Sequence, residues 1–124
     1  MNFIKKIAPW ALITLTALPF FAAGTMKLLG VPEVHVAFAN LGLPLLFGYF
    51  IGVCEIAGAI GLFLKKLSSL AALGLALIMA AAAAYHVAFD PITQAIPAIV
   101  LMLLAISVLF MRRSDSIIFA SKKA

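Results

Sequence analysis

Charged residues and cysteines are both scarce in this sequence, and each scarcity excludes a class of protein. Asp, Glu, Lys and Arg make up 10% of the 124 residues and hydrophobic residues 66%, whereas a soluble domain has about a quarter charged and about half apolar residues. The sequence is therefore neither an ordinary soluble domain nor a disordered chain. Its single cysteine, Cys54, excludes an intramolecular disulfide, a redox pair of thiols and a cysteine-rich zinc site. We expect Cys54 to be a small apolar packing residue.

Histidines and catalytic motifs are scarce as well. Two histidines are too few to predict a metal site, although a haem held between His35 and His86 stays open as an alternative. The sequence has no phosphate-binding loop, zincin motif or nucleophile elbow. The net charge of +5 does not indicate nucleic-acid binding, because the nine Lys and Arg residues are clustered instead of lying along one stripe. We expect no metal and no nucleic-acid partner, and whether the protein is an enzyme stays open.

Long apolar segments dominate the sequence instead. A helix that spans a bilayer needs about 20 mainly apolar residues, and four segments reach that length. Their apolar runs lack the alternation of apolar and polar residues that membrane β-barrel strands show. The sequence therefore predicts an all-α fold, in which residues 1–124 form a single transmembrane domain, a four-helix bundle in the lipid bilayer. The predicted helices cover residues 7–29, 44–64, 67–89 and 92–111.

The interruptions between these segments have physical causes. Pro32 lacks the N–H that would continue the first helix. Lys65 and Lys66 mark a turn in water. Asp90 is predicted to cap the fourth helix, with Pro91 at its first position, where the missing N–H costs nothing.

The connection at residues 31–43 is longer than the other two. Val34, Phe38 and Leu41 give it an apolar side, and polar residues lie elsewhere on it. We interpret it as a short helix on the outer surface of the membrane, with an irregular loop as the alternative.

The basic residues predict the orientation in the membrane, because cytoplasmic loops carry an excess of Lys and Arg. Eight of the nine fall on one side if both termini are cytoplasmic, and Lys27 alone lies toward the other side. The eight are Lys5, Lys6, Lys65, Lys66, Arg112, Arg113, Lys122 and Lys123. The sequence therefore predicts a bundle whose N-terminus and C-terminus both lie on the cytoplasmic side of the membrane.

Three ionisable residues within the predicted spans are candidate functional residues: Lys27, Glu55 and His86. Such residues are costly in a membrane, and each is a functional hypothesis for that reason. At helical spacing each lies on a stripe of small residues, as Glu55 does with Gly48 and Gly52. Because small residues let membrane helices approach closely, we expect all three side chains to face neighbouring helices. The fourth segment has no charge in its span and is expected to be a scaffold.

The depths of these residues predict that they share a site. Glu55 lies near the middle of its helix, and Lys27 and His86 lie about 12–14 Å above the midplane. Side chains lean toward the N-terminus of their own helix, so the three groups are predicted to converge on one cavity that opens outward. Glu55 is expected to pair with Lys27 or His86, directly or through water, because an isolated carboxylate there would be protonated. The alternative is that the cluster only holds the helices together.

Three stretches of the sequence carry a family resemblance. They are residues 22–28 followed by Pro32 and Glu33, residues 52–58, and the alanine-rich segment that ends at His86. Together they resemble the DoxX-like family of small bacterial membrane proteins, over about Phe20 to Leu109.

The resemblance implies a four-helix fold in the bacterial inner (plasma) membrane, with Lys27, Glu55 and His86 at the family's recurring polar positions. It also implies a redox association, since the family takes its name from a membrane subunit associated with thiosulfate-to-quinone oxidoreduction.

The leading functional interpretation is a redox-associated membrane protein that binds a quinone-like or other lipophilic small molecule near Lys27, Glu55 and His86. The carboxyl and imidazole groups would exchange protons as the ligand changes redox state, and a redox partner protein would deliver electrons. The cofactor is unknown, with a quinone as the candidate. Two alternatives stay open, a small proton-coupled transporter or permease and a ligand-free structural or assembly subunit. A homo-oligomer through the stripe at Gly48 and Gly52 also stays open.

Overall fold

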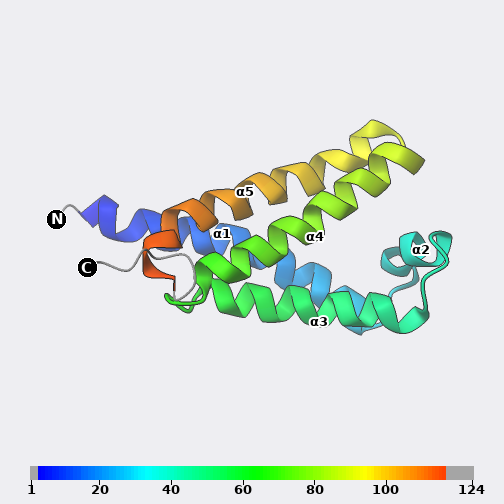
Figure 1. The fold of residues 1–124 in the computed structure, drawn as a ribbon, viewed down its shortest axis with the longest axis horizontal. Coiled ribbons are helices and arrows are strands. Elements are labelled where there is room, and N and C mark those ends of the chain that lie inside the picture. Colours follow the sequence, from blue (N-terminus) through cyan, green and yellow to red (C-terminus); the bar gives the residue numbers. More distant parts are fainter. Residues whose placement is uncertain (1–2, 117–124) are drawn as a thin grey trace, which may run out of the picture.

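The computed structural model describes residues 3–116, which form five α-helices and two 3₁₀ turns. In chain order the elements are α1 (Phe3–Leu28), α2 (Pro32–Asn40), α3 (Leu45–Leu62), α4 (Ser68–Phe89), η1 (Ile92–Ala95), α5 (Ile96–Arg112) and η2 (Arg113–Asp115) (Figure 1). Within the described residues, four helical segments are long and apolar enough to cross a membrane: α1, α3, α4 and Ile92–Asp115. The prediction of an all-α protein with four membrane-spanning helices is confirmed.

The long helices pack as two pairs. α1 lies along α3, α4 lies along α5, and contacts between α3 and α4 join the two pairs. In Figure 1 the pairs meet at the end that holds the start of α1 and the end of α5, which we call the terminal end. They diverge toward the opposite end, where α2 lies, which we call the α2 end.

Alanines make up much of the buried core, together with a few large side chains such as Phe20 and Leu75, while many other large apolar side chains point outward. The buried core includes Ala72 and Ala76 of α4 and Ala105 of α5. Leu15 and Leu103, in contrast, are exposed on the outer surface of the bundle. Lipid tails are as apolar as leucine, so membrane helices associate through close packing of small residues, as this distribution shows.

The connection between the first two spanning helices contains α2, so the helix interpretation is correct and the loop alternative is wrong. Pro32 begins the helix, where its missing N–H is tolerated. Gly30 lies just past the end of α1 and Gly42 just past the end of α2, with φ values of 75° and 74°, a left-handed conformation that favours glycine. None of the α2 residues is buried, so α2 covers its neighbours without entering the core. Its position on the membrane surface stays a prediction.

The start of the fourth span differs from the prediction. Asp90 ends α4, and Pro91 precedes the 3₁₀ turn η1 without a capping hydrogen bond from a side chain. The α-helical part of the span begins at Ile96, followed by Pro97. Asp90 does not cap this helix because its carboxylate pairs with His86 on α4 instead.

Basic residues gather at the terminal end. They are Lys5 and Lys6 of α1, Lys65 and Lys66 between α3 and α4, Arg112 at the end of α5 and Arg113 directly after it. Arg112 lies over the ring of Trp10 at 4.9 Å from its centre, so a cation–π contact joins α5 to α1. α1 begins at Phe3 instead of residue 7. Lys122 and Lys123 lie outside the described residues, and the side of the membrane that this cluster faces stays a prediction.

The first testable prediction concerns the contact between α4 and α5. Ser69 is fully buried, and its hydroxyl donates a 2.8 Å hydrogen bond to the Leu109 carbonyl. Ser69→Ala is expected to lower the free energy of unfolding in detergent micelles by about 0.5–1.5 kcal/mol. Ser107→Ala is the matched control, because this exposed hydroxyl donates to the Leu103 carbonyl oxygen of its own helix. Ser107→Ala should change the free energy of unfolding by no more than about 0.5 kcal/mol. Equal losses in the two variants would contradict the packing described for α4 and α5.

Candidate functional site

Lys27 and Glu55 form an ion pair between α1 and α3. Lys27 Nζ lies 2.7 Å from Glu55 Oε1, and the glutamate side chain has no exposed surface, whereas that of the lysine is 13% exposed. Glu55 Oε2 has no hydrogen-bond partner among the described residues. Of the two partners that the sequence left open for Glu55, the structure places Lys27 beside it.

A close approach of α1 and α3 makes this pair possible. A Cβ atom on Gly24 would lie 2.8 Å from the Gly52 carbonyl oxygen, and one on Gly52 would lie 2.9 Å from Lys27 Cβ. Neither position therefore has room for a side chain. Gly52 precedes Glu55 by three residues, so both lie on the same face of α3, and that face is buried as the stripe of small residues predicted.

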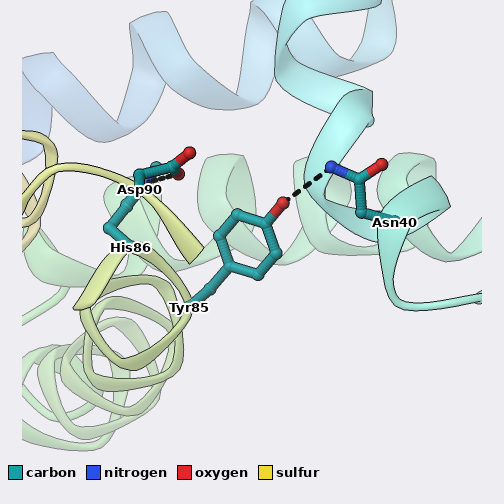
Figure 2. A network of polar contacts seen from close by, with 4 residues as sticks. All are labelled: Asn40, Tyr85, His86 and Asp90. Carbon is teal, nitrogen blue, oxygen red and sulfur yellow. Dashed lines mark hydrogen bonds and ion pairs between the residues drawn. The ribbon is translucent and has the colours of Figure 1, made fainter. Parts of the chain in front are cut away.

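His86 pairs with Asp90 on its own helix and not with Glu55. Its Nδ1 lies 2.8 Å from Asp90 Oδ2, and both side chains are partly exposed at the α2 end (Figure 2). Because a carboxylate accepts, the ring donates from Nδ1, which fixes its orientation and leaves Nε2 for another partner. Two of the three ionisable residues expected in one cluster, Lys27 and Glu55, thus form an ion pair, and His86 instead forms a hydrogen bond with Asp90, for which the sequence predicted only a capping role.

One pocket brings Lys27 and His86 together. It has a volume of about 640 Å³ and is enclosed mainly by α2, α3 and α4, and its size lies within the range of about 300–1,000 Å³ typical of small-molecule sites. Most of its wall is apolar and includes Phe47 and Ile78. Glu55 contributes through its ion pair with Lys27, which lines the pocket.

Tyr85 lines this pocket, and Asn40 contacts Tyr85 from outside the lining; neither residue was predicted from the sequence. Asn40 Nδ2 on α2 donates a 2.9 Å hydrogen bond to Tyr85 Oη on α4, and Figure 2 shows the tyrosine reaching from α4 toward α2. The Tyr85 ring also lies 5.0 Å from that of Phe89, centre to centre. A tyrosine beside His86 near the end of a spanning helix was a usable signal, since tyrosine favours membrane boundaries. Asn40 lies on a different helix, and no pattern in the neighbouring sequence predicts that it contacts Tyr85.

His35 makes its contacts away from the pocket. Its Nε2 lies 2.9 Å from the Lys27 carbonyl oxygen, and its ring lies 4.8 Å from that of Tyr49, centre to centre. Gly48 leaves room for this ring, because a Cβ there would collide with it. His35 thus contacts α1 and α3 while His86 lines the pocket, an arrangement that does not support a haem between them. Residues 3–116 contain no group of three or more His, Cys, Asp or Glu that could hold a metal ion.

A comparison with protein-family models places the chain in a family. The model described as the DoxX-like family matches residues 11–108, a range that includes Lys27, Glu55 and His86. The chain belongs to the DoxX-like family. This DoxX-like protein is therefore a multi-pass membrane protein, as the resemblance implied. Neither the curated proteins nor the solved structures gave a match.

The close approach of α1 and α3 generates a second prediction. Gly52→Ala is expected to lower the free energy of unfolding by about 1–3 kcal/mol, because the added methyl group forces the helices apart. Gly74→Ala is the matched control, since a Cβ there meets nothing within 4 Å. It should be neutral or stabilise by up to about 1 kcal/mol through helix propensity. Denaturation of both variants in micelles measures the difference, and a neutral Gly52→Ala would contradict the contact.

The ion pair generates a third prediction. Lys27→Met and Glu55→Gln are each expected to cost up to about 3–5 kcal/mol of unfolding free energy, because each removes the partner of an ionisable side chain, which must then lose its charge or stay unpaired. The double variant leaves neither charge, so its loss should be smaller than the sum of the single losses by about 0.5–3 kcal/mol. The four proteins form a double-mutant cycle measured by denaturation in the same detergent. Strict additivity would show that the two side chains do not interact.

Proposed function

We propose that this DoxX-like protein binds a lipophilic small molecule with a quinone-like head group, as part of a membrane redox system. The observation that carries the proposal is the pocket of about 640 Å³ with Lys27 and His86 on an otherwise largely apolar wall. Ligand sites are typically apolar with a few placed polar groups, and ionisable residues within spanning helices mark functional sites by default.

Lys27 and His86 offer the hydrogen-bonding groups that a quinone-like head requires. The Lys27 ammonium group has three N–H donors, and Glu55 engages one side of it, so others are available to a carbonyl oxygen of the ligand. Asp90 holds His86 Nδ1, which leaves Nε2 to give or take a proton when the ligand changes redox state. Reduction of a quinone consumes two electrons and two protons. The chain supplies the binding groups and a proton site, and a redox partner protein supplies the electrons, since a single cysteine forms no internal disulfide couple.

Proton-coupled transport is the second candidate function, and the burial of Glu55 favours it. A carboxylate enclosed within a membrane span is a group that proton-coupled transporters use to carry protons. In that case Glu55→Gln should abolish uptake driven by a proton gradient in vesicles, whereas ligand binding by a redox component needs no gradient.

The basic cluster at the terminal end supports a location in the bacterial inner membrane with both termini in the cytoplasm, because Lys and Arg are enriched in cytoplasmic loops. In this orientation the α2 end and the pocket face the outer side, and α2 lies on the membrane surface.

A fourth prediction tests ligand binding. Protein extracted gently from its native membrane should retain a lipophilic molecule at near one-to-one ratio, detected by a visible spectrum and by mass spectrometry of a solvent extract. Decylubiquinone, used as the probe, should bind the protein in nanodiscs, and His86→Gln should weaken its binding by about two- to ten-fold through the lost hydrogen bond. Ser107→Ala, on α5 and outside the pocket, is the control that should bind as the wild type does.

A wild-type protein that retains no molecule and binds no decylubiquinone would contradict this function. Gradient-driven uptake that requires Glu55 would then favour transport, and its absence would favour a ligand-free assembly subunit.

A further inference from the structure

The pocket extends along α4 from the α2 end to the middle of the helix. Leu77, near the middle of α4, and His86, near its end, both line it. They are nine positions apart in the sequence, which corresponds to about 14 Å at 1.5 Å per residue. This length is close to half of the roughly 30 Å hydrocarbon thickness of a bilayer. The pocket is therefore about as deep as one lipid leaflet.

Polar and apolar groups are separated along this depth. The deeper part on α4 is lined by Leu77 and Ile78, and Leu77 is 62% exposed. The deeper part is thus apolar, as the alkyl tail of a ligand requires. The polar lining residues lie near the α2 end: Lys27, Glu33, Tyr85 and His86.

Tyr85 has a hydrogen available for a ligand. Its Oη accepts the hydrogen bond that Asn40 Nδ2 donates, so the tyrosine's own O–H is not used in that contact. The bond also holds the hydroxyl group between α2 and α4, where the tyrosine lines the pocket (Figure 2). A head group with a carbonyl or ether oxygen can accept this hydrogen.

We propose that the ligand is a single-tailed amphiphile whose head group accepts a hydrogen bond from Tyr85 and whose apolar tail lies along α4 past Leu77 toward the lipid. Asn40 is a positioning residue, because it acts on the ligand only by orienting the Tyr85 hydroxyl. This inference rests on the proposed function of the pocket as a ligand site, and it adds the class of ligand and its direction. The ligand would enter from one leaflet, past the exposed Leu77 side chain.

The head-group contact is tested by removing single hydroxyl groups. Tyr85→Phe keeps the ring that packs on Phe89 and should weaken binding of decylubiquinone in nanodiscs by about two- to ten-fold, the effect of one lost hydrogen bond. Tyr49→Phe is the matched control, because Tyr49 lies on α3 outside the pocket lining, and it should leave binding unchanged. Unchanged binding by Tyr85→Phe would overturn the assignment of the donor.

The positioning role of Asn40 has a different readout. Asn40→Ala should weaken decylubiquinone binding in the wild-type protein by no more than Tyr85→Phe does, and should have no further effect in the Tyr85→Phe background. Its thermal midpoint should stay near that of the wild type, since Asn40 is exposed. Equal weakening in both backgrounds would mean that Asn40 acts independently of Tyr85, and would overturn its positioning role.

The direction of the tail is tested with a decyl-benzoquinone that carries a photoreactive diazirine at the end of its tail. After irradiation in nanodiscs, peptide mass spectrometry should find labels near Leu77 in the middle of α4, and excess decylubiquinone should suppress them. Suppressible labels confined to the part of α4 near Tyr85 and Phe89 would reverse the orientation and overturn the inference. If the wild type binds neither probe, the proposed function itself fails; binding of both probes without these effects overturns only this inference.

Discussion

A buried ion pair governs how the helices of this DoxX-like protein are arranged. The Glu55 side chain, on the spanning helix α3, has no exposed surface, and its Oε1 lies 2.7 Å from Lys27 Nζ. Either side chain alone would be a costly charge in an apolar environment. The pair can form only because Gly24 and Gly52 let α1 and α3 come so close that neither position has room for a Cβ atom. The ion pair and the close glycine contact therefore depend on each other, and together they hold α1 against α3.

The pocket follows from how the second pair is attached. α4 and α5 pack closely through alanines, whereas the two pairs diverge toward the α2 end. The space between them is closed over by α2, whose Asn40 bonds to Tyr85 across it. Lys27 thus has two roles, since it neutralises Glu55 on one side and lines the pocket on the other. Under the proposed function, the ion pair and the ligand site share this residue, which would account for a residue so costly in a membrane at this position.

The sequence predicts the parts of this structure that depend on local patterns. The length of the apolar segments predicts the four spans, and small residues at helical spacing predict the buried face of α3 that carries Glu55. The partner of Glu55 was left open between Lys27 and His86, because depth along a helix does not determine how helices are placed beside one another. For the same reason the contact of Asn40 with Tyr85 was missed, since it joins two helices far apart in the chain. The expected cap at Asp90 failed because a local carboxylate–imidazole pair competed for the same group.

The central claim is that Lys27, one partner of the buried ion pair, also lines the proposed ligand pocket, and nuclear magnetic resonance of the lysine side chains tests it most directly. Protein labelled with ¹⁵N-lysine would be placed in nanodiscs, and the Lys27 signal would be assigned by its loss in Lys27→Met. We predict a Lys27 ammonium signal whose hydrogens exchange slowly with water, which shifts when decylubiquinone is added, while the signals of Lys65 and Lys66 at the terminal end do not change. A Lys27 signal that exchanges as fast as those of Lys65 and Lys66 and does not respond to the quinone would contradict the claim.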